Sequence, residues 1–147
     1  MATPSLPPST DRLALIESAR NSVFVEKAFT TTPLDPVIER SWRRCLGLGY
    51  RPEERVSFAA VSKSATAHAL EVNRPLLQAA NPIMAQMAHA MAMTRYFAIL
   101  TDARGVVIDT SGPIDRSDSR VNNIARIGVD LSEEAVGTTA IGAALAD

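Results

Sequence analysis

Apolar residues near the start of the chain recur every three or four positions, which is the spacing of one helical face. They are Leu13, Ile16, Ala19, Val23 and Phe24. The spacing predicts an amphipathic helix from Ser9 or Thr10 to about Thr30. Residues 1–8 are rich in proline, show no periodicity and are expected to form a disordered leader.

A second helix is predicted from Pro36 to Leu46, because Asp35 can cap its first amides and proline suits a first helical turn. Its apolar positions are Ile38, Trp42, Cys45 and Leu46. Gly47 and Gly49 are expected to end it. We expect Trp42 to be buried against other helices of an antiparallel N-terminal group spanning residues 9–63.

A long helical arm is predicted next, and prolines interrupt it. Phe58 and Val61 extend the helical pattern, and Arg74-Pro75 breaks it because proline lacks a backbone donor. Asn81-Pro82 resembles the cap and first turn of a further helix. The apolar residues that follow on one face are Ile83, Met87, Ala90 and Met91. The arm opens a second region, residues 64–147.

The period changes to that of extended chain after Arg95. Two short apolar runs, 96–101 and 106–110, flank the turn 102–105 and predict a β-hairpin. An isolated hairpin is marginal in water, and no third strand is predicted before Asp147. The fold class is therefore α+β, with a sheet that is incomplete at its C-terminal end.

Short helical pieces are predicted after the hairpin, over residues 124–127, 132–135 and 138–145. Ser132 and Thr138 are expected to cap the last two, since hydroxyl side chains accept hydrogen bonds from free first-turn amides. Gly137 supplies the tight turn between them.

Composition narrows the function by exclusion. The 147 residues are 46% apolar and carry a formal net charge of −1, which argues against a dedicated nucleic-acid-binding surface. No apolar run reaches the roughly 18–20 residues of a membrane span, and the start of the chain does not resemble a signal peptide. One cysteine, Cys45, can form no internal disulfide. A cytoplasmic protein with no membrane partner is expected.

Candidate chemistry is sparse. His68 and His89 have no carboxylate partner at ligand spacing, Ser132 has no nearby base, and no GxxxxGK[ST] phosphate loop occurs. Glutamates lie among a cluster of arginines that could contact phosphate, which favours a solvated, salt-bridged face or a dimer surface. The cluster comprises Arg40, Arg43, Arg44, Arg51 and Arg55. We expect no catalytic residue, no metal and no cofactor, so the chain is not expected to be an enzyme.

Three segments carry recognisable motifs. The first reads Ser41-Trp42-Arg43-Arg44-Cys45 and the second Leu-Thr-Asp-Ala-Arg-Gly-Val-Val over 100–107. The third runs over 128–145 and includes Ser132-Glu133 and the run Gly-Thr-Thr-Ala-Ile-Gly over 137–142. In this order they resemble the N-terminal region of acetoin-type sigma-54-dependent transcriptional activators of the Fis family. The motif residues, expected to be structural, are Ser41, Trp42, Cys45, Asp102, Gly105, Ser132, Glu133, Gly137 and Thr138.

The resemblance implies a bacterial signal-receiving region that ends with the first half of a GAF domain. Such a domain would sense a small metabolite or a partner and control an ATPase that remodels sigma-54 RNA polymerase. The remaining strands, the ATPase and the DNA-binding module would lie beyond Asp147, so RNA polymerase and DNA would be contacted outside this chain. The ligand pocket would lie between the sheet and its cover. Its expected residues are Phe97, Ile99, Leu100, Ile124 and Ile127.

Two alternatives remain. One is a helical dimerisation or interaction module with no ligand of its own. The other is a GAF-type reductase of oxidised methionine, which a lone cysteine outside the sheet disfavours. Unpaired strand edges and exposed apolar helix faces also predict self-association, as a homodimer or larger assembly, mainly through helices.

Overall fold

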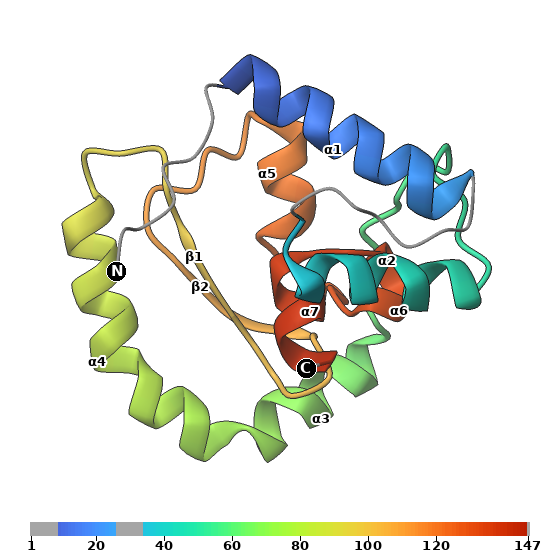
Figure 1. Ribbon diagram of the computed structural model, residues 1–147. Coiled ribbons are helices and arrows are strands. Elements are labelled where there is room, and N and C mark those ends of the chain that lie inside the picture. The colour runs from blue at the N-terminus through green and yellow to red at the C-terminus, as the bar shows by residue number, and fades with distance from the viewer. Residues whose placement is uncertain (1–8, 26–33, 147) are drawn as a thin grey trace, which may run out of the picture. The chain divides into compact units, whose positions relative to one another are not determined.

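The computed structural model describes residues 9–25 and 34–146, which divide into two compact units, Met1–Glu54 and Arg55–Asp147 (Figure 1). The predicted leader over 1–8 lies outside the described residues. The first unit contains α1 (Ser9–Phe24) and α2 (Pro36–Gly47). The second contains α3 (Lys63–Val72), α4 (Arg74–Met91), β1 (Ala98–Thr101), β2 (Val107–Ser111), α5 (Ser119–Ile124), α6 (Glu133–Val136) and α7 (Ala140–Ala146). The predicted α+β class is confirmed.

In the first unit, α1 packs on α2. Val23 of α1 is fully buried, whereas Leu13 is 65% exposed, so the apolar face of α1 is narrower than predicted. The rings of Phe24 and Trp42 lie with their centroids 5.2 Å apart. Trp42 itself is half-buried and Ser41 is fully buried, which corrects the prediction of a buried tryptophan. Two helices alone leave a large ring at the margin of their contact.

The ends of α2 follow from its capping residues. The Asp35 carboxylate accepts a hydrogen bond from the Val37 amide at 2.9 Å, so the predicted N-cap is confirmed. At the other end Gly49 has a φ of 92°, and its amide donates to the Leu46 carbonyl at 3.0 Å. Gly47 stays in the last helical turn. Gly49 therefore ends the helix, because glycine adopts the left-handed conformation at little cost.

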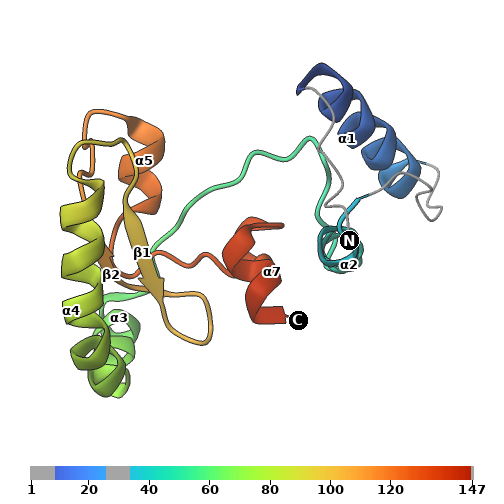
Figure 2. The same cartoon turned by 60° about the vertical axis from the view of Figure 1, so that its left-hand side comes forward.

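The two helices are crossed, and the prediction of antiparallel helices is wrong. Both run from left to right in Figure 1, and in Figure 2 α2 is viewed almost along its axis while α1 lies across the view. An antiparallel helix pair is usually joined by about two to eight residues. Here 11 residues separate Phe24 from Pro36, which is long enough for the chain to return before α2 begins. The predicted end of the first helix near Thr30 lies outside the described residues.

The arm starts within one residue of the predicted position, since α3 begins at Lys63, but the helix predicted around Phe58 and Val61 does not form. Phe58 and Val61 lie in an extended segment, and α3 begins after Ser62, whose hydroxyl accepts a hydrogen bond from the Ala65 amide at 3.1 Å. The reason is sheet pairing, because the Val61 amide donates to the Gly128 carbonyl at 2.8 Å. A backbone amide used in this way cannot also start a helix.

The two predictions that rest on prolines of the helical arm have different outcomes. The break at Arg74-Pro75 is confirmed, since α3 ends at Val72 and α4 starts at Arg74. Pro82 instead lies inside α4, so a helix start at Asn81-Pro82 is wrong. A proline inside a helix removes a single backbone donor, and the burial of Met84, 7% exposed, favours a helix that continues past it.

The predicted hairpin is confirmed. β1 and β2 pair antiparallel, from Ala98 opposite Ser111 to Thr101 opposite Val107, and Ile108 is the extra residue of a β-bulge. Val107 and Ile108 are both buried, at 0% and 1% exposure. Neighbouring residues of a strand face opposite sides, so the sheet has a core on each face.

Short extended segments continue the sheet beyond β2, which partly corrects the prediction of unpaired edges. The Val107 amide donates to the Val129 carbonyl, and the Gly128 amide to the Val107 carbonyl, each at 2.8 Å. The Asp130 amide in turn donates to the Ala59 carbonyl at 3.1 Å. Each added segment is too brief for period-2 alternation to show in the sequence. Among the described residues, no segment pairs with the other edge of β1.

The short helices after the hairpin differ from their predicted positions. The piece predicted over 124–127 is α5, which starts earlier because the Asp118 carboxylate caps it through the Arg120 amide at 2.9 Å. Ser132 precedes α6, but its side chain makes no capping hydrogen bond. For α7 the cap is not Thr138 but Thr139, whose hydroxyl accepts from the Gly142 amide at 2.9 Å.

Candidate functional site

The sheet of the second unit separates two apolar clusters. On one face Ala69, Val106 and Ile108 pack with Val61, Leu70, Leu77 and Leu100 beneath α3 and α4. On the other face, Val107, Val129 and Leu131 pack with Phe58, Ile99, Ile124 and Ile141. We call this second cluster the α5–α7 face, because α5 and α7 supply Ile124 and Ile141. Figure 2 shows α3 and α4 on one side of the strands and α7 on the other.

The structure separates the five predicted pocket residues. Ile99 and Ile124 lie together on the α5–α7 face. Leu100 belongs to the cluster beneath α3 and α4, as strand alternation requires of the residue after Ile99. Phe97 is half-buried just before β1, and Ile127 is 48% exposed beyond α5.

Most residues of the α5–α7 face were not among the predicted pocket residues. The alternation rule, applied to β1, separates Ile99 from Leu100 without any structure. Val129 and Leu131 also follow that rule, since they are two positions apart. The missed residues are Phe58, Val107, Val129, Leu131 and Ile141.

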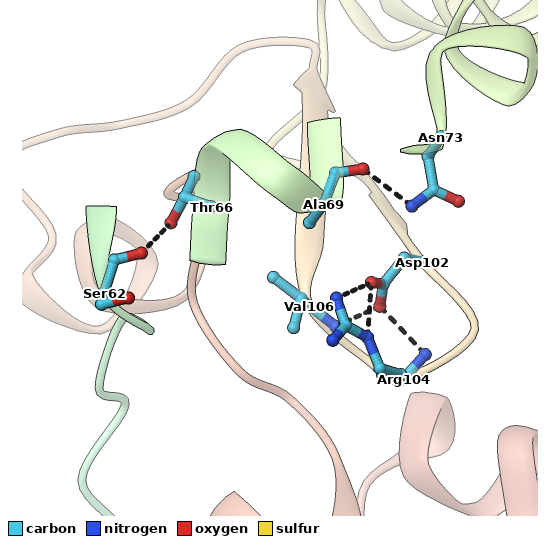
Figure 3. Close-up of polar contacts among 7 residues, drawn as sticks. All are labelled: Ser62, Thr66, Ala69, Asn73, Asp102, Arg104 and Val106. Atoms are coloured by element: carbon cyan, nitrogen blue, oxygen red, sulfur yellow. Dashed lines mark hydrogen bonds and ion pairs between the residues drawn. The ribbon is translucent and has the colours of Figure 1, made fainter. Parts of the chain in front are cut away.

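The hairpin turn is closed by the motif residue Asp102 (Figure 3). Its side chain is 3% exposed, and its Oδ1 accepts hydrogen bonds from the amides of Arg104 and Val106, both at 2.9 Å. The Arg104 guanidinium donates to Oδ2 from Nε at 3.2 Å and Nη2 at 3.1 Å. These four bonds use both carboxylate oxygens, so Asp102 has a structural role here.

Gly105 joins this turn to the segment that enters α6. Its φ is 91°, and a Cβ there would lie 2.8 Å from the Ser132 backbone nitrogen. The Leu131 amide donates to the Gly105 carbonyl at 2.9 Å. The approach leaves no room for a side chain, which explains glycine at this motif position.

Glu133 and Gly142 pack α6 against α7. Glu133 is 8% exposed, and a Cβ on Gly142 would lie 2.8 Å from the Glu133 Cγ. Gly137, with a φ of 75°, forms the turn between the two helices, and Thr138 follows it half-buried. These motif residues thereby position α7, and with it Ile141 of the α5–α7 face.

The side chains of Thr66 and Asn73 make hydrogen bonds within α3 and its caps (Figure 3). The Thr66 hydroxyl donates to the Ser62 carbonyl at 3.1 Å, and a Cβ on Gly128 would lie 2.6 Å from that hydroxyl oxygen. The Asn73 side chain donates to the Ala69 carbonyl at 2.8 Å and closes the end of α3. The extended segment at Gly128 is therefore packed tightly between α3 and β2.

The cover over the α5–α7 face is held by polar contacts near the surface. Arg116 Nη1 donates to the Ala125 carbonyl at 2.9 Å and so satisfies the end of α5. Hydrogen bonds from Arg120 lower the pKa of the Asp118 carboxyl at the start of α5. Hydrogen bonds from Ser117 lower the pKa of Asp115 in the same way.

In the first unit, the motif residues of α2 lie on the packed side of the helix. Ser41 and Cys45 are buried, at 0% and 6% exposure, and Trp42 contacts Phe24. Arg43 Nη2 lies 2.7 Å from Glu39 Oε1, one helical turn away. This ion pair supports the interpretation of the arginine cluster as a salt-bridged face.

The described part of the chain contains no group of three His, Cys, Asp or Glu side chains that could hold a metal ion. No helix among the described residues is long and apolar enough to cross a membrane.

A family model described as the MimR N-terminal domain matches residues 15–147. The chain belongs to the MimR N-terminal domain family. It is also similar to the acetoin catabolism regulatory protein of Cupriavidus necator, with 30% identity over 114 residues. That alignment covers 76% of this chain and 17% of the relative, so the chain spans less than a fifth of that protein's length. No solved structure gives a significant match.

These matches confirm the prediction of a regulator's N-terminal region related to acetoin regulators. The match to the MimR N-terminal domain begins within α1 and runs through α7. Both compact units of the structure are therefore parts of one family domain. The α5–α7 face lies wholly inside the matched region.

Proposed function

We propose that this MimR N-terminal domain is the signal-receiving region of a cytoplasmic, sigma-54-dependent transcriptional activator. Its second unit is a GAF-type sensory domain that takes a small-molecule effector. In this proposal the chain is a regulator rather than an enzyme. The downstream ATPase, sigma-54 RNA polymerase and DNA are engaged by other parts of the whole protein.

The observation that supports sensing is the α5–α7 face. Its residues are aliphatic apart from Phe58, and when its cover opens such a surface would suit a small, weakly polar molecule held by a few backbone groups. The short helices α5 and α7 contribute to this face, and short elements with surface-exposed hydrogen bonds open at low free-energy cost. The similar protein of Cupriavidus necator is named for acetoin catabolism, which makes acetoin the first effector to test.

The test is thermal unfolding of the chain with acetoin, and then with other short ketones, diols and carboxylic acids. A ligand at a hundred times its dissociation constant stabilises the folded state by about 2.7 kcal/mol. We expect Ile99→Val, which removes one methylene from the α5–α7 face, to weaken binding about fourfold.

The matched control is Leu100→Val, the same kind of truncation on the neighbouring residue and the opposite face. It should leave the affinity unchanged. If no compound shifts the unfolding transition, or if both variants weaken binding equally, the α5–α7 face is not the sensory site.

A second candidate function, an interaction module without its own ligand, is favoured by one observation. α4 exposes large apolar side chains, with Leu76 at 41%, Ile83 at 59% and Met87 at 43% exposure. Self-association as a homodimer or larger assembly is therefore proposed with either function. Sedimentation equilibrium at micromolar concentration tests it.

A further inference from the structure

The orientation of α4 about its axis is fixed by its contacts with the sheet. Leu77 packs into the cluster that contains Val106 and Ile108. Met84 is 7% exposed, and its carbonyl accepts a hydrogen bond from the Ser111 hydroxyl at 2.9 Å. Met84 therefore marks the inward direction of the helix.

The two sides of α4 that flank this inward direction differ in chemistry. Each residue turns the helix by about 100°. Residues four or seven positions from Ile83 therefore lie on the same side as Ile83, and Gln78 and Asn81 lie on the other side. The first side, here called the apolar flank, comprises Leu76, Ala79, Ile83, Met87 and Ala90, all exposed. His89 lies with the polar side, and Gln86 lies outward.

The apolar flank is also free of charge. From Pro75 to Met91 the helix has no Asp, Glu, Lys or Arg, whereas the exposed side of a surface helix is ordinarily charged or polar. Charges occur at its two ends. Glu71, paired with Arg74, lies at the N-terminal end, and the exposed Arg95 follows the C-terminal end.

We propose that the apolar flank is the interface with a second copy of this chain, in which two α4 helices pack antiparallel about a two-fold axis at Ile83. In that arrangement, residues equally far before and after Ile83 meet. Leu76 meets Ala90 and Ala79 meets Met87, so these two large side chains each face an alanine, and Ile83 meets its own copy at the axis. The helices can then approach to the roughly 8–10 Å of packed pairs.

Charge is compatible with the antiparallel direction. Glu71 and Arg95 are each 12 positions from Ile83 in the sequence, so the antiparallel pairing brings the end of α4 beside the Glu71–Arg74 pair toward Arg95 of the other copy. A parallel pairing would instead place Arg95 beside its own copy, and Leu76 and Met87 beside theirs. The interface rests on the self-association proposed above and is independent of effector binding.

Cysteine cross-linking tests whether the two α4 helices pack antiparallel. Ile83→Cys should give a disulfide-linked dimer under mild oxidation. Leu76→Cys mixed with a tagged Ala90→Cys should give the mixed dimer, while neither forms one alone. Gln78→Cys, exposed on the polar side, is the matched control and should not link. The native Cys45 is buried, so the unmodified chain serves as the blank.

Sedimentation equilibrium tests whether the apolar flank forms the dimer interface. Ile83→Glu places two carboxylates together at the axis, and the dimer dissociation constant should rise at least about a hundredfold. Gln78→Glu adds the same charge on the polar side and should leave it unchanged.

Each contrary result overturns a different part of the proposal. A monomeric unmodified chain at micromolar concentration overturns both self-association and the interface. A dimer that tolerates Ile83→Glu overturns the interface and leaves self-association standing. Self-linking of Leu76→Cys without the mixed dimer overturns the antiparallel arrangement.

Discussion

The two faces of the sheet in the second unit are covered by elements of very different length. α3 and α4, of 10 and 18 residues, lie over one face, whereas α5 and α7, of 6 and 7 residues, contribute to the other. A long helix retains most of its hydrogen bonds if one end frays. Short helices depend on caps and on the segments that join them.

The difference indicates where the second unit can open locally. The face beneath α3 and α4 is called the scaffold here. Strand residues are fully buried on both faces, with Ile108 at 1% and Val107 at 0% exposure, so the difference lies in the covers. The α5–α7 face has a cover held by Arg116, Asp118 and Thr139, whose hydrogen bonds lie at or near the surface. Local opening should therefore occur at the α5–α7 face before the scaffold unfolds.

The largest difference between the two faces is expected when one isoleucine on each face is truncated. Ile108→Ala should cost about 2–5 kcal/mol of the free energy of unfolding, because the side chain is fully enclosed. Ile124→Ala, on half-buried α5, should cost about 1–2 kcal/mol. Urea denaturation measures both. Equal losses would show that the two faces are packed alike.

A substitution at Gly105, in the turn that contacts the segment before α6, should lower the free energy of unfolding almost as much. Gly105→Ala adds a Cβ 2.8 Å from the Ser132 backbone nitrogen in a left-handed conformation, and should cost about 2–4 kcal/mol. Gly137→Ala is the matched control, since Gly137 also has a positive φ but nothing lies within 4 Å of its added Cβ. It should cost about 1–3 kcal/mol, because its φ of 75° with a ψ of −157° lies in a region that only glycine adopts readily. If the two variants lose the same stability, the turn does not brace α6.

How much of this could be predicted from the sequence depends on the range of the interaction. The cap Asp35 and the break at Arg74-Pro75 act within one helical turn, and both were predicted. Pro82 was misread, because the packing that favours a continuous α4 involves the distant residue Ser111. Long-range contacts of that kind leave no local pattern.

The candidate site shows the same limit. Local alternation separates Ile99 from Leu100, but the pairing of β2 with Val129 joins residues more than 20 positions apart. The start of α5 was missed for a different reason. Its cap at Asp118 is local, but the segment around it is polar, and the prediction followed the apolar residues beyond it.

A smaller effect is expected at Arg116. Arg116→Ala removes the 2.9 Å hydrogen bond to the Ala125 carbonyl and should weaken α5 by about 1 kcal/mol. Hydrogen exchange of the α5 amides should then be about fivefold faster, with α4 unchanged. Arg126→Ala is the control, because its contacts at 3.4 and 3.5 Å are long. Equal acceleration in α4 would mean that α5 does not open locally.

The smallest effect is expected from acid. Hydrogen bonds from Arg120 lower the pKa of Asp118 below its ordinary 3.8, so the folded state favours the ionised carboxylate. Its stabilising contribution is present above that ordinary value and is lost as the pH falls through the lower folded pKa. Exchange of the α5 amides, corrected for intrinsic rates, should therefore accelerate below about pH 4.

Asp118→Asn keeps an acceptor at the cap but cannot titrate, so its α5 exchange should lose most of this acid dependence. The remainder should come from Asp115, whose pKa Ser117 lowers in the same direction. If Asp118→Asn shows the full acid dependence of the unmodified chain, the cap at Asp118 is not what holds α5 over the α5–α7 face.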